Sequence, residues 1–135
     1  MNSDFGRSAG APPRVTGFRI GSREGTEIQV YRRGFWVIGW KLPPPIIFSR
    51  AIIAPRLNQL LKLYPGLPRR FKAVLRTGLG PSWMLQGNGC GLSQEDGAYR
   101  RDSWVEISLN EPPTDNWLNL WRTLLRDAAF ELSER

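Results

Sequence analysis

The chain has 135 residues, of which 41% are apolar, and it carries a formal net charge of +7 with one cysteine and no histidine. A chain of this size and apolar content buries enough surface to fold without a disulfide or a metal, and it is not a largely disordered protein. The lack of histidine excludes His-based catalytic triads and Cys/His zinc sites within one chain.

Residues 1–13 are rich in glycine, proline, serine and alanine, and they predict a flexible N-terminal tail ahead of one α+β domain at 14–135. We find no signal-peptide pattern, and Lys41, three prolines and Arg50 interrupt the most apolar tract. These features predict a protein of cytoplasmic or other intracellular type, without a membrane span.

Alternating segments between Arg14 and Leu42 predict a three-stranded antiparallel meander with turns near 21–25 and 33–34. The last segment is aromatic and β-branched, which suits a buried strand. Trp36 and Trp40 share one face of that strand, so we expect them to pack in the core rather than to serve as a peptide hook. The prolines at 43–45 end the strand and predict a structural corner.

Three helices are expected after this corner. Ser49 is placed to cap the first, which extends to about Tyr64 with a leucine stripe. The second runs from Pro68 to Gly78, because proline suits a helix start and glycine a helix end. The third, Asn116 to about Leu132, is capped by Thr114 or Asp115, and its broad apolar face predicts burial on the sheet or a homodimer contact.

Two further strands are predicted, at Trp83–Gln86 and Tyr99–Leu109. The glycine-rich segment 87–91 lacks the spacing of phosphate-binding loops, so we interpret it as a hairpin connection. Cys90 within it has no histidine or basic neighbour to activate a thiolate, so no nucleophile is expected. The predicted fold is α+β, an antiparallel sheet in the order β-β-β-α-α-β-β-α with the C-terminal helix packed on it.

Charge is distributed unevenly along the chain. No acidic residue occurs between Glu27 and Glu95, whereas that stretch carries ten cations, and the acids gather from Asp102 onward. The simpler explanation is that the two halves of the chain pack together and pair some of these charges. The more specific one is that the cations form a basic face that binds nucleic acid. The residues predicted to contact a nucleic-acid backbone are Arg32, Arg33, Arg69, Arg70, Lys72 and Arg76, with Arg100 and Arg101 as extensions.

The sequence therefore favours a small basic binding protein that contacts RNA or DNA without strong sequence readout, because no base-reading motif is present. Exposed aromatic side chains would add base stacking, with Tyr31, Trp36 and Trp83 as candidates. No catalytic residue, metal ligand or cofactor is predicted.

Two alternatives stay open. The basic face would also suit an acidic protein partner, as in an assembly factor, a complex subunit or a mobile-element accessory protein. A divalent-metal nuclease is the other, because Glu95, Asp96, Asp102 and Glu106 form the densest carboxylate group. Asp102 and Glu106, with Lys72, would be its first residues to test.

Overall fold

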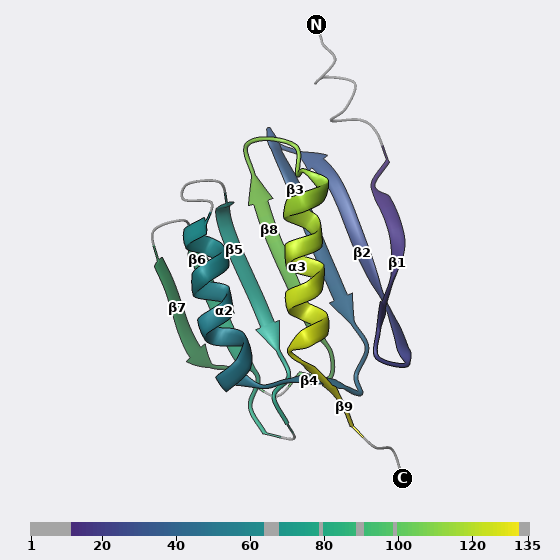
Figure 1. Ribbon diagram of the computed structural model, residues 1–135, viewed down its shortest axis with the longest axis vertical. Coiled ribbons are helices and arrows are strands. Elements are labelled where there is room, and N and C mark those ends of the chain that lie inside the picture. The colour runs from purple at the N-terminus through teal and green to yellow at the C-terminus, as the bar shows by residue number, and fades with distance from the viewer. Residues whose placement is uncertain (1–11, 64–67, 79, 89–90, 99, 133–135) are drawn as a thin grey trace, which may run out of the picture.

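The computed structural model describes residues 12–63, 68–78, 80–88, 91–98 and 100–132, without the side chains of residues 62, 63, 68 and 69. These residues form a seven-stranded antiparallel sheet, a two-stranded sheet and two helices (Figure 1). The tail expected at 1–13 lies almost wholly outside the described residues. In chain order the elements are β1 (Arg14–Ile20), β2 (Arg23–Arg32), β3 (Phe35–Leu42), β4 (Ile46–Phe48), α2 (Arg50–Leu63), β5 (Pro68–Leu75), β6 (Trp83–Asn88), β7 (Gly91–Asp96), β8 (Ser103–Leu109), α3 (Asp115–Asp127) and β9 (Ala129–Glu131).

The predicted meander is confirmed as β1, β2 and β3, which are joined by tight turns. Arg33 and Gly34, the two residues between β2 and β3, have φ angles of 56° and 85°. Type I′ hairpin turns need a positive φ at both central positions, which glycine adopts freely and arginine only at a cost. This turn sets Arg32 opposite Phe35 and thereby the register of β2 on β3.

The segment predicted as a second helix is strand β5, so the described chain contains two helices rather than three. Phe71, Val74 and Leu75 have the spacing of a helical stripe, but Phe71, Ala73 and Leu75 also alternate along a strand. β5 pairs with β6 on one side and β8 on the other, and this pairing outweighs local helix propensity. The element order is accordingly β-β-β-β-α-β-β-β-β-α-β.

Strand β8 lies at the centre of the sheet, whose order is β1-β2-β3-β8-β5-β6-β7. It confirms the strand predicted at Tyr99–Leu109 from Ser103 onward, with Val105, Ile107 and Leu109 buried on one face. The hairpin interpretation of the glycine-rich segment is also supported, because β6 and β7 pair up to Asn88 and Gly91. Cys90 lies outside the described residues.

Both helices lie on the same face of the sheet (Figure 1). The side chain of Ser49 accepts a bond from the N–H of Ile52 at the start of α2. Of the two residues predicted to cap this helix, Thr114 and Asp115, Thr114 is the cap of α3, since its Oγ1 accepts a hydrogen bond from the N–H of Trp117 at 3.2 Å. Helix α3 ends at Asp127 rather than near Leu132. The residues that follow form β9, which pairs with β4 beside the proline corner.

Aromatic side chains between α3 and the sheet form the centre of the core. The ring of Trp121 lies 5.5 Å from Phe71, 5.8 Å from Trp117 and 6.4 Å from Trp40, centroid to centroid. The predicted packing of the C-terminal helix on the sheet is thus confirmed. A homodimer through this helix stays a prediction, and it would use the outward side, where Leu120 is exposed. Among the described helices none has the length and apolarity to cross a membrane.

Candidate nucleic-acid interface

The sheet has one side that no helix of the described residues covers, here termed the uncovered face (Figure 1). Alternate residues of a strand point to opposite faces. Because Val105, Ile107 and their neighbours in β8 pack under the helices, the residues between them point the other way. The register then sets Trp104 beside Lys41 and Val74, Glu106 beside Gly39 and Lys72, and Ser108 beside Val37 and Arg70.

Three of the predicted binding residues, Arg32, Arg70 and Lys72, meet on the uncovered face. Arg32 Nη2 lies 3.9 Å from Glu106 Oε2, with both side chains largely exposed. Lys72 Nζ lies 5.9 Å from the centroid of the Trp104 ring. These contacts join β2, β5 and β8, so cations that are distant in sequence share one surface.

The other predicted residues take different positions. Arg33 is exposed in the β2–β3 turn, next to Arg32. Arg100 and Arg101 are exposed ahead of β8, at the end of that strand opposite to the β2–β3 turn. Arg69 belongs to β5, but its side chain lies outside the described part of the structure. Among the described side chains of this set, Arg33 is the one that adjoins the group on the uncovered face, through its neighbour Arg32.

Arg76 is a buried residue with internal partners. Its side chain is only slightly accessible, and its Nη1 and Nε donate to the carbonyl oxygens of Pro44 and Gly78. Its backbone N–H donates to Ser103 Oγ at 2.8 Å. Arg76 thus ties the proline corner to the ends of β5 and β8, and its charge is directed inward.

The aromatic residues of the uncovered face are Trp104 and Phe35, both half-buried. Tyr31, Trp36 and Trp83, which the sequence indicated as stacking candidates, belong instead to the helix-covered face by their register with Leu109 and Leu75. The alternation of β8 was the available signal for Trp104, because it separates this residue from the apolar side of the strand. A hollow of about 330 Å³ at the turn end of the face is lined by Phe35, Arg70, Gly87, Asn88 and Ser108.

Three of the four carboxylates that would serve a nuclease pair with different cations. Asp102 pairs with Lys41 at 4.0 Å, and Glu106 pairs with Arg32. Asp96 lies on the helix-covered side, 2.5 Å from Arg50 Nη2. Within the described chain, no group of three or more potential ligand residues is arranged to hold a metal ion.

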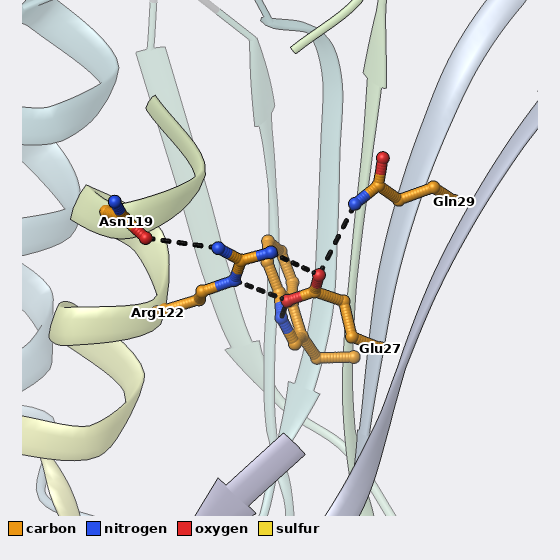
Figure 2. Close-up of polar contacts among 5 residues, drawn as sticks. Glu27, Gln29, Asn119 and Arg122 are labelled. Carbon is orange, nitrogen blue, oxygen red and sulfur yellow. Dashed lines mark hydrogen bonds and ion pairs between the residues drawn. The ribbon is translucent and has the colours of Figure 1, made fainter. Parts of the chain in front are cut away.

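On the covered side, Glu27 is buried in contact with α3, a position that sequence analysis did not single out. Its carboxylate accepts hydrogen bonds from Trp40 Nε1 at 2.7 Å and from Arg122 Nε and Nη2 at 2.9 and 2.7 Å (Figure 2). Asn119 Oδ1 accepts from Arg122 Nη1, and Gln29 Nε2 donates to Glu27 at 3.4 Å. The group opens onto a polar cleft of about 260 Å³ beside β1 and the start of α3.

Burial alone would raise the pKa of Glu27, but the hydrogen bonds and charge of Arg122 and the indole of Trp40 lower the pKa below its ordinary value of 4.5. The same pair raises the pKa of Arg122, chiefly through its hydrogen bond to Glu27. The charges of Glu27 and Arg122 are each other's partners. We therefore interpret Glu27–Arg122 as a structural ion pair that stabilises the packing of α3 on β2.

Acidification is expected to reduce the stabilisation that the Glu27–Arg122 ion pair contributes to the fold. A carboxylate whose pKa is lower in the folded state stabilises the fold above its unfolded pKa, and that contribution is lost as pH falls through the folded value. The free energy of unfolding of the wild-type chain should therefore decrease more steeply below about pH 4.5 than that of Glu27→Gln. Urea denaturation between pH 3 and pH 6 measures both slopes, and equal slopes would contradict this assignment.

Comparisons with protein-family models, with curated proteins and with solved structures give no match for this chain.

Proposed function

We propose that the protein binds nucleic acid through the uncovered face, mainly by contacts to the phosphate backbone and without strong sequence readout. The observation that carries this proposal is the meeting of Arg32, Arg70 and Lys72 on a face that no described helix covers. Guanidinium groups bind phosphate oxygens through paired hydrogen bonds, and lysine adds a point charge. Arg33 in the adjacent turn extends this surface.

The surface carries acids as well as cations, because Asp102 pairs with Lys41 and the register sets Glu95 opposite Met84 on the same face. Glu106 lies among the proposed binding cations themselves. Its pairs with exposed side chains are weak, and a phosphate group competes for the same donors. Binding of this kind releases counterions, so its affinity falls steeply as salt concentration rises. Salt dependence is therefore the property that identifies the interaction.

The test is the double substitution Arg70→Ala/Lys72→Ala. Each lost phosphate contact lowers the slope of log K against log salt by about 0.7–0.9, so the double variant should lose about 1.5 units of slope together with affinity. Fluorescence anisotropy titrations of a labelled oligonucleotide at several salt concentrations measure both quantities.

The matched control is Arg50→Ala/Arg56→Ala, which also removes two cations but from α2, on the covered side of the sheet. It should retain most of the affinity and slope. An equal loss in the two double variants would show that binding follows net charge rather than this face. Absence of any oligonucleotide binding at low salt, with a protein partner that persists after nuclease treatment, would instead support an acidic protein as the partner.

A further inference from the structure

We infer that the uncovered face prefers single-stranded nucleic acid and stacks bases on Trp104 and Phe35, an inference that rests on the proposed function. Two cations lie between two aromatic rings along this face. From one end of β8 to the other, the register places Trp104, then Lys72 beside Glu106, then Arg70 beside Ser108, and then Phe35 opposite Arg32 at the turn. Proteins that bind single strands combine these two kinds of residue, cations for the backbone and rings for the bases.

The surroundings of Trp104 favour an indole that lies flat on the sheet. Val74 points to the uncovered face, yet it is only 3% exposed. Its direct cross-strand neighbours are Trp104 and Met84, both half-buried. The Cγ and Sδ atoms of Met84 lie against Gly97, just after β7, and so point away from Val74. Long side chains on neighbouring strands reach across such a residue, so we expect the indole of Trp104 to cover Val74 and to direct one ring face outward.

Lys72 does not close that ring face. Its ammonium lies 5.9 Å from the ring centroid, at the outer limit of a cation–π contact. Such a contact is weak at an exposed site, so the flexible lysine can turn to a phosphate while a base takes its place over the ring. Lys72 then binds a phosphate group and at the same time leaves the Trp104 ring open to a base.

Phe35 provides the second ring, at the other end of the face. It lines the hollow of about 330 Å³ together with Arg70 and Asn88, where a base has both a ring and polar partners within reach. Trp104 lies six residues along β8 from the level of Phe35, a span of roughly 20 Å at about 3.3 Å per residue. A strand of several nucleotides is needed to contact both rings, with Lys72 and Arg70 placed between them.

A duplex fits this surface poorly. Seven strands spaced about 4.8 Å apart form a sheet about 30 Å wide, whereas the major groove of B-DNA is about 12 Å wide. The sheet therefore meets a duplex only at its phosphates, and the paired bases stay stacked inside. Single strands, whose bases turn outward freely, gain both kinds of contact.

The test compares a labelled single-stranded 20-mer of mixed sequence with its own duplex, using the full chain. The wild type should bind the single strand more tightly. Trp104→Ala should weaken single-strand binding by about 5-fold to 150-fold, the loss typical of one stacked base, with little change for the duplex or in the salt slope. Lys72→Ala should lower the salt slope for both, and Trp104→Phe should restore part of the single-strand affinity.

Equal affinity for the two forms, unchanged by Trp104→Ala, would overturn the stacking inference while leaving the proposed function in place. No binding of either form would overturn both. Trp104→Leu keeps an apolar cover over Val74 without a flat ring, and it replaces Trp104→Ala if the alanine variant does not fold. Single-strand binding by Trp104→Leu at the wild-type level would also overturn the inference.

Discussion

Replacement of Arg122 by methionine is expected to lower the free energy of unfolding by about 3–5 kcal/mol, because it leaves the carboxylate of Glu27 buried without its ionic partner. Glu27 is only 2% exposed, and Arg122 donates two of its hydrogen bonds. Small domains are stable by only about 5–15 kcal/mol, so this loss is a large part of the total. Urea denaturation at pH 7 measures it.

The control is Arg56→Met, which removes an arginine from the exposed pair with Asp127 and should cost no more than about 1 kcal/mol. The double variant Glu27→Gln/Arg122→Met separates the ion pair from packing, since glutamine keeps an oxygen for Trp40 Nε1. It should be more stable than Arg122→Met alone. If the double variant is no more stable, an unpaired charge is not the cause of the loss.

The second large effect concerns two neighbouring indoles. Trp40 and Trp121 are stacked 6.4 Å apart and are almost fully buried, but their N–H groups differ. Trp40 Nε1 donates to the Glu27 carboxylate, whereas Trp121 Nε1 has no hydrogen-bond partner among the described residues. Hydrogen bonds to charged groups contribute about 1.5–3 kcal/mol, so Trp40→Phe should destabilise the protein by about that much more than Trp121→Phe.

Each of these two substitutions removes the same atoms from the same aromatic cluster, so the loss of packing is matched. Thermal and urea unfolding of the two variants give the comparison directly. Equal losses would show that the bond from Trp40 to Glu27 contributes little, and a larger loss in Trp121→Phe would contradict its lack of a polar partner.

Much of the fold follows from local patterns in the sequence. The three strands from Arg14 to Leu42 and the face of β8 that carries Val105 and Ile107 were predicted correctly, and Thr114 was one of the two caps expected for α3. Each of these features has a local signal in the sequence: a regular apolar alternation, prolines that end a strand, or a capping residue. Strand β7, the polar edge strand Gly91–Asp96, has no apolar alternation, no proline stop and no cap. It takes its conformation from pairing with β6, and was therefore not predicted.

The candidate interface was only partly predictable, because two steps depended on tertiary structure. Arg69, Lys72 and Arg76 have helical spacing, but in a strand alternate residues share a face, which groups Arg70 with Lys72 instead. The sequence alone could not assign Ile28 and Val30 to a face of the sheet, because the turn at 33–34 interrupts the alternation between β2 and β3. Their register sets both on the uncovered face and directs Glu27 toward α3.

The central position of β8 also bears on how the protein folds. The meander β1–β2–β3 and the ribbon β5–β6–β7 each pair strands that are neighbours in the chain, but they are joined only through β8, which comes later than both. Pairing across such long separations is slow, since much chain must be ordered before the contacts form. The surface that carries Arg32, Lys72 and Trp104 is complete only when β8 pairs with both β3 and β5. The proposed oligonucleotide binding would therefore return during refolding at that late step, after the meander and the ribbon have formed.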